Sequence, residues 1–472
     1  SRLGRIWFGI LLAQALCCTH ALATPATQAP NVVVIMTDDQ GWGDLSLHGN
    51  QTVRTPNIDR LAREGVRFEH FFVQPVCSPT RAEFLTGRYY PRGGVYSTGA
   101  GGERLDLDET TIADVFADAG YRTGAFGKWH NGTQYPYHPN GRGFDTFHGF
   151  TSGHWGLYFD PMIDDNGAIT RSSGYLPDAI TDQCIDFIAQ SAGANDPFFA
   201  FLSFNTPHSP MQVPDRFWDR YEDLAIRQEG SEKGRAVALH TKAALAMCEN
   251  IDWNVERLLD HLTDIGVEKD TIVIFMTDNG PNGHRWNGGM RGIKGSPDEG
   301  GVRSPLFIRW PGGLAAGRVV TEICGAIDLL PSLAELAGIP VDTKHPLDGV
   351  SFAPLLFESA ADWEERLLFS YWGDRLSVRS QRYRLDHEGR LYDMVVDPGQ
   401  TRDIADEKPG VAAWLGAAAE QWRTDVVGEG ANTSRPFPVG HPDYGVTHLP
   451  ARDAIAHGGI ERSNRWPNDS FF

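Results

Sequence analysis

The sequence predicts an α/β fold with a largely parallel central sheet, followed by a smaller antiparallel sheet. Two apolar runs, Val32 to Met36 and Ile272 to Met276, lack polar alternation, which is typical of parallel strands covered on both faces. Segments with helical periodicity separate such runs, as they do in α/β folds. The chain has 472 residues, which is enough for a large core and two domains.

The helical segments follow one another along the chain with recognisable signals. Thr55 is expected to cap a helix that begins at Pro56 and buries Ile58, Leu61 and Ala62 on one face. Further helices are expected within residues 108–121, 237–266 and 329–337. These helices would cover the strands of the central sheet.

The predicted strands end in polar side chains. The residues concerned are Asp38 and Asp39, Lys128 and His130, His208, and Asp278 and Asn279. Each alone is an ordinary turn or loop residue, but ligands in parallel sheets bind beyond the carboxyl ends of the strands. Several such endings together therefore predict one site, without identifying its chemistry.

The stretch VQPVCSPTRAEFLTGR, residues 73–88, reads as the start of a helix. We expect Ser78 to cap it and Pro79 to occupy its first turn, where a missing N–H costs nothing. Cys77 would then lie at the positive end of the helix dipole, where an anion can bind. Its position alone leaves a structural and a catalytic role open.

The N-terminal residues have the pattern of a signal peptide. Arg2 and Arg5 precede the apolar run from Ile6 to Cys17, and a small-x-small cleavage pattern ends at Ala23. We therefore expect residues 1–23 to be a signal peptide, the protein to be exported to the periplasm or the exterior, and no stable membrane insertion. The net charge of −19 argues against nucleic-acid binding.

Three cysteines remain besides Cys77 after residue 23, namely Cys184, Cys248 and Cys324. One disulfide between two of these three cysteines is possible, and the sequence does not determine which pair would form it. Beyond a boundary near residue 360, short alternating runs with glycine-containing turns predict an antiparallel sheet. The expected division is thus a large domain over residues 24–360 and a C-terminal subdomain with an irregular tail over residues 361–472.

Several motifs occur in a fixed order along the chain. They are TDDQGWGDL, CSPTRAEFLTGR, GKWH, TPHSP, TDNG, RGIKG, EGGVRSPLFIRWPG and, in the C-terminal part, LYDMVVDPGQTRDIA. Together they resemble the type I, formylglycine-dependent sulfatases of the alkaline-phosphatase-like superfamily, over nearly all of the chain after residue 23. The resemblance implies an α/β/α sandwich and an enzyme that hydrolyses sulfate esters to release inorganic sulfate.

The resemblance also implies a modification of Cys77. In this family a separate maturation enzyme, the formylglycine-generating enzyme or an equivalent, oxidises the motif cysteine to formylglycine, an aldehyde. Its hydrate is a geminal diol, of which one hydroxyl attacks sulfur and expels the alcohol. The other hydroxyl then loses its proton, and sulfate leaves as the aldehyde forms again.

Further roles follow from the same resemblance. A divalent cation is implied, bound by Asp38, Asp39, Cys77, Asp278 and Asn279. This set, rich in hard oxygen ligands, favours Ca²⁺ over Mg²⁺. By the same resemblance, Arg81 would steady the formylglycine, and Lys128 and Lys294 would bind the sulfate oxygens. His208 would protonate the leaving group, and His130 would assist the release of sulfate.

One position departs from the family pattern. The family often has His-Leu-Gly after the Lys-Trp pair, whereas this chain has His130-Asn131-Gly132. The departure bears on the subfamily and leaves Lys128 and His130 in place. Activity is therefore still expected.

A sulfated carbohydrate is the expected substrate of an exported hydrolase with a site for an anionic group. His154 and Trp155, and likewise His284, Arg285 and Trp286, could stack on sugar rings or bond hydroxyls. The second group is expected to contribute more, because it lies between the cation-binding motif and Lys294. Loop packing is the competing interpretation for each of these residues.

Three other functions remain open at this stage. They are an unspecific arylsulfatase, a phosphoester or phosphonate hydrolase of the same superfamily, and an inactive protein that binds sulfated glycans. The Cys77-x-Pro79-x-Arg81 pattern and a single apparent metal site favour sulfate over phosphate esters. The complete set of motifs disfavours an inactive protein.

Overall fold

The computed structural model describes residues 29–226, 234–357 and 363–428, and residues 436–459 with gaps at 437, 443, 450–453 and 455–456. The expected signal peptide, residues 1–23, lies outside the described residues, as does most of the expected tail beyond Gly428. Among the described residues, none of the helices combines the length and apolar character that a membrane span requires.

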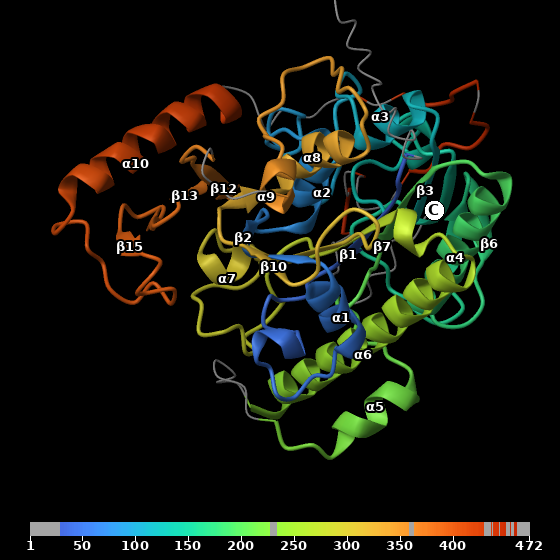
Figure 1. The fold of residues 1–472 in the computed structure, drawn as a ribbon, viewed down its shortest axis with the longest axis horizontal. Coiled ribbons are helices and arrows are strands. Elements are labelled where there is room, and N and C mark those ends of the chain that lie inside the picture. The colour runs from blue at the N-terminus through green and yellow to red at the C-terminus, as the bar shows by residue number, and fades with distance from the viewer. Residues whose placement is uncertain are drawn as a thin grey trace, which may run out of the picture.

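An eleven-stranded sheet forms the centre of the fold (Figure 1). Ten strands follow the order β10-β2-β9-β8-β1-β7-β3-β4-β5-β6, and β11 pairs with β2. The strands are β1 (Asn31–Thr37), β2 (Val66–Phe72), β3 (Arg122–Lys128), β4 (Thr146–Phe150), β5 (Met162–Asp165), β6 (Ala168–Arg171), β7 (Phe198–Ser203), β8 (Thr271–Thr277), β9 (Arg303–Arg309), β10 (Arg318–Val320) and β11 (Cys324–Gly325). The run β8-β1-β7-β3-β4 is parallel throughout, which confirms the largely parallel sheet.

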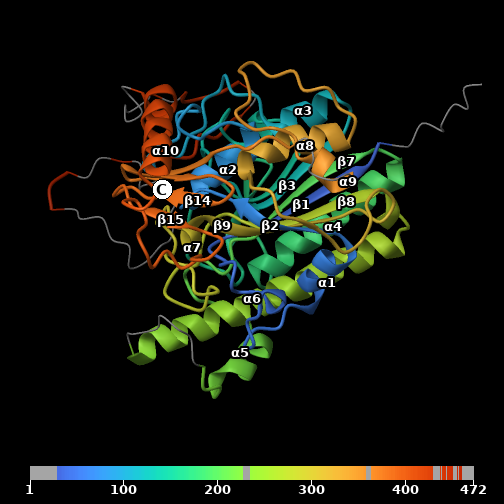
Figure 2. The same cartoon turned by 60° about the vertical axis from the view of Figure 1, so that its left-hand side comes forward.

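Helices cover both faces of this sheet (Figure 2). The α-helices of the described residues are α1 (Pro56–Glu64), α2 (Cys77–Thr86), α3 (Ile112–Asp118), α4 (Leu176–Ala194), α5 (Asp215–Glu222), α6 (Gly234–Asp264), α7 (Glu299–Val302), α8 (Leu329–Leu336), α9 (Ala353–Phe357) and α10 (Pro409–Trp422). Val33 and Ile35 of β1 pack in the core under α1, α4 and α6. Val32 and Val34 pack in the opposite core, with α2, α3 and α8. Because both faces are buried, the strand is apolar throughout.

The expected helices form, but two predicted caps differ in detail. Thr55 occupies the N-cap position of α1, yet its hydroxyl contacts Ser46 and Asp59 and caps no helix N–H. Helix α2 begins at Cys77 with Val76 as its N-cap, so the prediction that Ser78 caps it is wrong. Ser78 lies inside the first turn, together with the proline that follows it.

A second, four-stranded antiparallel sheet follows in the C-terminal part, as expected. Its strands are β12 (Leu368–Trp372), β13 (Arg375–Arg379), β14 (Tyr383–Leu385) and β15 (Leu391–Asp393). Leu415 of α10 packs on Val378, Leu385 and Leu391 of this sheet. Leu368 and Leu376 pack with Phe72 of β2 in a shared cluster, so the small sheet is attached to the edge of the large one.

Cys77, Cys184, Cys248 and Cys324 are all free and buried. The possible disulfide among the last three is therefore not formed. Cys184 and Cys324 instead belong to the two cores beside the central sheet.

Candidate active site

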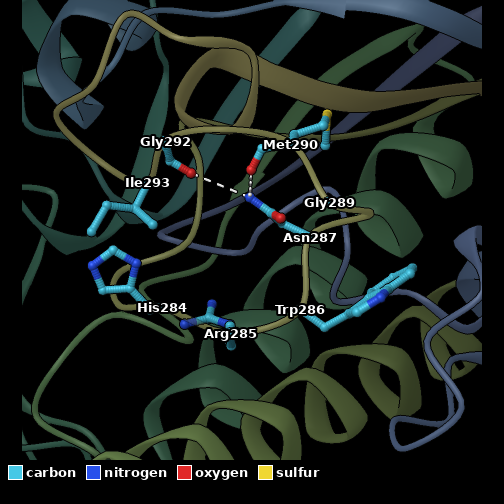
Figure 3. Close-up of a pocket in the computed structure, with 8 residues that line it drawn as sticks. All are labelled: His284, Arg285, Trp286, Asn287, Gly289, Met290, Gly292 and Ile293. Atoms are coloured by element: carbon cyan, nitrogen blue, oxygen red, sulfur yellow. Dashed lines mark hydrogen bonds between the residues drawn. The ribbon is translucent and has the colours of Figure 1, made fainter. Parts of the chain in front are cut away.

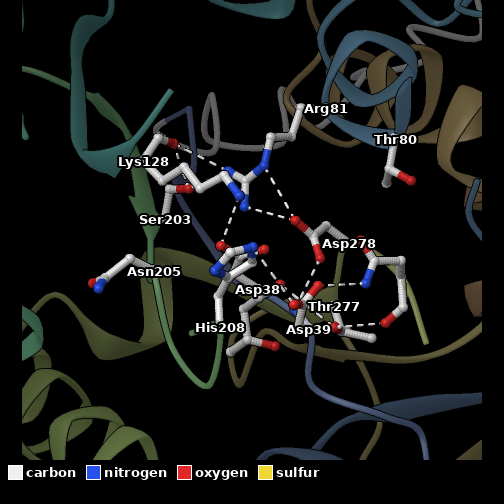
Figure 4. A network of polar contacts seen from close by, with 12 residues as sticks. Asp38, Asp39, Thr80, Arg81, Lys128, Ser203, Asn205, His208, Thr277 and Asp278 are labelled. Atoms are coloured by element: carbon white, nitrogen blue, oxygen red, sulfur yellow. Dashed lines mark hydrogen bonds and ion pairs between the residues drawn. The ribbon is translucent and has the colours of Figure 1, made fainter. Parts of the chain in front are cut away.

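The carboxyl ends of four adjacent parallel strands, β8, β1, β7 and β3, meet at one edge of the central sheet. Asp38 and Asp39 follow β1, Asp278 follows β8, and Lys128 ends β3. The backbone ladder continues past the strand ends, because the Asp278 N–H donates to the Thr37 carbonyl at 3.0 Å. Side chains that lie far apart in the sequence are therefore brought together, as the strand endings predicted (Figure 4).

Three buried carboxylates each contact a different cationic side chain. The Lys128 Nζ lies 2.7 Å from an Asp38 oxygen, and the Lys294 Nζ lies 2.6 Å from an Asp39 oxygen. The Arg81 guanidinium lies 2.9 Å from Asp278 Oδ2. Close opposite charges are required here, because an isolated buried carboxylate would be strongly destabilising.

Several oxygen atoms of this cluster still lack a hydrogen-bond partner. Among the described residues, Asp38 Oδ1, Asp39 Oδ2 and Asn279 Oδ1 are buried and accept no hydrogen bond. One carboxylate oxygen each of Asp38 and Asp278 lies within 4.8 Å of the Cys77 Sγ and of the other. Buried oxygens without donors are what a hard divalent cation requires, so the residues present fit such an ion.

The surroundings shift the pKa values of Asp39 and Asp278 in opposite directions. Burial alone would raise the pKa of Asp39, but Lys294, His208 and Asn279 reverse this effect and leave it lowered. For Asp278, burial and then the Asp38 charge raise the pKa to about 6, although Arg81 and Lys128 oppose the change. A further positive charge in the cluster would therefore oppose the raised pKa of Asp278 and favour its ionised form.

Cys77 is the first residue of α2 and is buried. Burial raises the pKa of its thiol, while Lys128 and Lys294 act in the opposite direction without cancelling the effect. The thiol is thus protonated at neutral pH, whereas a cysteine nucleophile acts as the thiolate. Cysteine itself is poorly suited to attack from this position.

Arg81 connects the start of α2 to three strand ends. Its Nη1 donates to the Lys128 carbonyl at 3.0 Å and to the Ser203 Oγ at 2.5 Å, in addition to its ion pair with Asp278. Sequence reasoning missed Ser203, which also donates to the Lys128 carbonyl at 2.7 Å. The available signal was that Ser203 is the polar last residue of an otherwise apolar strand.

His208 lies beside Asp39 with a fixed ring orientation. Its Nδ1 is 2.7 Å from the Ser209 carbonyl, which can only accept, so Nδ1 carries a hydrogen. The Nε2 atom then faces Asp39 Oδ2 at 3.7 Å. Burial, followed by the charge of Lys294, lowers the pKa of His208 to about 3, so the ring is neutral until an added negative charge favours its protonation.

His130 lies just beyond the end of β3, with a positive φ of 69°. Its Nε2 is 2.9 Å from the Thr98 carbonyl, so in the neutral ring Nδ1 is the basic nitrogen. Gly153 packs directly on the imidazole, since a Cβ there would lie 2.0 Å from Nε2. The ring is therefore held in one orientation.

His154 and Trp155, two predicted substrate contacts, occupy different surroundings. The His154 ring lies edge-on to His208 with the centroids 5.0 Å apart. Trp155 is buried and stacks on Phe150 at 5.1 Å. The Trp155 ring serves core packing, so the predicted sugar contact does not fit its position.

The loop after β8 lines a pocket of about 200 Å³ (Figure 3). Its lining comprises His284, Arg285, Trp286, Asn287, Gly289, Met290, Gly292 and Ile293. His284 is exposed and Trp286 is half-buried. These two side chains are accessible to a ligand.

Arg285 has a different role from the predicted one. It is buried, and its Nε and Nη2 donate to the carboxylate of Asp44 at 2.6–2.8 Å. Its Nη2 also donates to the Asp39 carbonyl at 2.8 Å. Because these partners occupy the guanidinium, the prediction that Arg285 binds substrate is corrected: it supports the backbone that carries Asp39.

Comparison with known proteins decides the family. The family described as Sulfatase matches residues 30–339, and that described as N-sulphoglucosamine sulphohydrolase, C-terminal, matches residues 297–413. The chain belongs to the sulfatase family. It is accordingly a sulfuric ester hydrolase with the alkaline-phosphatase-like fold.

Relatives of this sulfatase include enzymes with different named substrates. The mouse N-acetylgalactosamine-6-sulfatase is 31% identical over 394 residues, which cover 75% of this chain and 71% of the relative. The mouse steryl-sulfatase is 32% identical over 448 residues, which cover 74% of this chain and 69% of the relative. The family relationship therefore leaves the substrate open.

Solved structures agree with the fold. The crystal structure of Ps i-CgsB has a TM-score of 0.77 and 26% identity, and the match covers 85% of this sulfatase and 94% of that chain. The phosphonate monoester hydrolase of Agrobacterium radiobacter has a TM-score of 0.64 and 22% identity, and the match covers 84% of this chain and 95% of that chain. The second match extends the common fold to an enzyme of different chemistry.

The burial of Arg285 predicts a stability defect. Replacement of Arg285 by Ala in this sulfatase leaves the Asp44 carboxylate buried and unpaired, so we expect the free energy of unfolding to fall by roughly 3–5 kcal/mol. His284→Ala is the matched control, and its exposed neighbouring position predicts a change of less than about 0.5 kcal/mol. Chemical denaturation monitored by tryptophan fluorescence measures both. An Arg285→Ala protein as stable as wild type, with only its substrate affinity reduced, would restore the substrate-binding interpretation.

Proposed function

We propose that this sulfatase releases sulfate from a sulfated carbohydrate, with Cys77 matured to formylglycine and Ca²⁺ bound to the carboxylate cluster. The observation that carries the proposal is the buried group of Asp38, Asp39 and Asp278 beside Cys77, surrounded by cationic side chains. A sulfate ester, which carries one negative charge, would meet the positive charges of Lys128 and Lys294 when placed against Cys77. Charge that develops on the leaving oxygen would be stabilised by the same groups.

The modification of Cys77 is part of the proposal. Members of the family generally use formylglycine, and the raised pKa of the Cys77 thiol argues against an unmodified cysteine nucleophile. In the matured protein the modified side chain supplies an oxygen nucleophile in place of a thiol. The start of α2 and the Arg81 contacts hold position 77 against the cluster. A formylglycine-generating or equivalent enzyme is the implied partner.

The proposed cation ligands are Asp38, Asp39, Asp278 and Asn279, with the modified residue 77 completing the set. Three of them have a buried oxygen with no hydrogen-bond partner. Oxygen ligands that include several carboxylates favour Ca²⁺ over Mg²⁺, which demands stricter octahedral geometry. The ion would supply positive charge toward the sulfate oxygens and would offset repulsion among the carboxylates.

Two lysines are proposed to bind the sulfate oxygens. Lys128 and Lys294 contact different carboxylates of the cluster, at 2.7 Å from Asp38 and at 2.6 Å from Asp39 respectively. When the cation occupies those carboxylates, each ammonium keeps donors for the substrate, because a lysine has three. Arg81 remains tied to Asp278 and backbone, and so orients position 77.

Two histidines are proposed to move protons. His208 would protonate the leaving oxygen from Nε2, the nitrogen that faces Asp39. The negative charge of a bound sulfate ester would oppose the lowering of its pKa by burial and Lys294. His130 would accept a proton at Nδ1 during release of sulfate, since Nε2 is engaged with Thr98.

The sugar is proposed to bind at the pocket after β8. His284 and Trp286 supply an exposed imidazole and a half-buried aromatic face there, which suit hydroxyls and the C–H side of a sugar ring. The name N-acetylgalactosamine-6-sulfatase and a related structure of Ps i-CgsB in complex with k-i-k-neocarrahexaose support a carbohydrate. His154 is proposed as a further contact beside His208.

Export and domain division complete the proposal. The signal-peptide pattern of residues 1–23 supports a periplasmic or extracellular enzyme, where sulfated polysaccharides are met. We propose a catalytic domain over residues 24–360 and a C-terminal subdomain over residues 361–472. The separate antiparallel sheet after residue 367 supports this division.

Replacement of Cys77 tests the nucleophile. Cys77→Ala removes the precursor of the aldehyde, so sulfate release should fall by roughly three orders of magnitude or more, with the unfolding temperature unchanged within a few degrees. Cys184→Ala, a buried thiol in the core, is the control and should keep most of the activity. Mass spectrometry of the peptide that contains residue 77 should show formylglycine in active wild type. An active protein with only unmodified Cys77 would refute the proposal.

Substrate preference is tested at His284. Loss of a hydrogen bond to the sugar should lower kcat/KM of His284→Ala by roughly tenfold on a sulfated mono- or oligosaccharide, and by less than about twofold on a small aryl sulfate. Kinetics on both substrates, with wild type in parallel, measure the difference. Equal losses on both, with no sulfated sugar cleaved above background by wild type, would favour the unspecific arylsulfatase instead.

A further inference from the structure

The segment that carries Lys294 is held from outside by the C-terminal sheet. It connects the pocket loop to α7 and contains Gly292 and Gly295, both with positive φ, at 97° and 83°. Glycine-containing segments of this kind have little conformational preference of their own. The position of the Lys294 backbone therefore depends on hydrogen bonds to neighbouring parts of the chain.

Gly295, the residue next to Lys294, joins two such neighbours. Its N–H donates to the Pro75 carbonyl at 2.7 Å, two residues before Cys77. Its carbonyl accepts a hydrogen bond from Arg375 Nη2 at 2.5 Å, on the side of the C-terminal sheet. One residue thus ties the lysine segment both to the Cys77 loop and to Arg375.

Arg375 is itself held in a defined place. It is the first residue of β13 and pairs with Trp372 across a tight hairpin. The two turn residues, Gly373 and Asp374, both have positive φ, at 55° and 62°, as in the two-residue turns that match the twist of a hairpin. The guanidinium therefore extends from a hairpin of defined geometry.

The same sheet is also attached on the Cys77 side. The Gln74 Nε2 donates to the Phe369 carbonyl at 3.0 Å, and the Tyr371 N–H donates to Gln74 Oε1 at 3.0 Å. Strand β12 is thus bound to the loop before Cys77, while β13 reaches Gly295. The sheet acts as a common support for both sides of the site.

We propose that Arg375 is a positioning residue: its hydrogen bond to the Gly295 carbonyl fixes Lys294 for binding of the sulfate group. The inference rests on the proposed function, in which Lys294 binds sulfate. Arg384 also contacts the segment, donating to the Pro297 carbonyl at 2.8 Å, but it is fully buried on Glu299. Arg375 is half-buried and so offers the cleaner substitution.

The test compares Arg375→Ala, Arg375→Lys and Arg382→Ala in the full-length, matured enzyme. Arg382→Ala is the matched control, because it removes an arginine of the same subdomain whose guanidinium pairs with Asp393 and, within the described part of the chain, bonds no residue of the lysine segment. With a small aryl sulfate, Arg375→Ala should lower kcat/KM by roughly tenfold or more. Inhibition of Arg375→Ala by inorganic sulfate should weaken by a similar factor. Arg375→Lys should recover part of both losses. For the Arg382→Ala control, kcat/KM and inhibition by sulfate should stay within about twofold of wild type.

A double-mutant cycle with Lys294→Ala separates positioning from general damage. If Arg375 acts through Lys294, Arg375→Ala should cause no further loss in the Lys294→Ala background. Two results would overturn this inference while leaving the proposed function intact. One is that Arg375→Ala lowers kcat/KM in the Lys294→Ala background by as much as it does in wild type. The other is that Arg375→Ala leaves the kcat/KM of an active enzyme unchanged. A wild type that cleaves no sulfate ester and binds no inorganic sulfate overturns the proposed function together with it.

Discussion

The need to neutralise buried negative charge governs this molecule. Asp38, Asp39 and Asp278 lie together at the end of the central sheet with almost no exposed surface. Such carboxylates are tolerated only if cations and donors surround them. Lys128, Arg81 and Lys294 come from β3, α2 and a distant loop to supply that charge, and oxygens without donors still remain. The buried oxygens without donors are unfavourable for folding, but they can bind a cation, and the cationic side chains around them can bind a sulfate group.

The topology makes this concentration of charge possible. Parallel strands end at the same edge, so a carboxylate after β1 and another after β8 become neighbours across more than two hundred residues of sequence. The antiparallel C-terminal sheet has a supporting role, because it forms hydrogen bonds to the loops that carry Cys77 and Lys294. The fold and the charge balance are therefore linked through these hydrogen bonds.

Much of this arrangement was predictable from local sequence. Apolar runs such as Val32 to Met36 predicted buried parallel strands, and the polar residues after them predicted one shared site. The details that depend on partners far away in sequence were not predictable. The position of Arg285 in the loop after the cation-binding motif predicted a contact with substrate. Its ion pair with Asp44 becomes visible only in the folded structure. Ser78 had the character of a cap, yet α2 begins earlier, because tertiary contacts of the Cys77 loop set where the helix starts.

The central claim is that the three carboxylates form a divalent-cation site on which catalysis depends. Elemental analysis of purified, matured wild type and of Asp278→Asn, together with sulfate release by the same preparations, tests it most directly. Asp278→Asn keeps the shape of the side chain while it removes the charge that Arg81 pairs with. The account predicts a single bound divalent cation, Ca²⁺, in active wild type, and loss of both cation and activity in Asp278→Asn. Wild-type enzyme that is fully active with no bound divalent cation would contradict it.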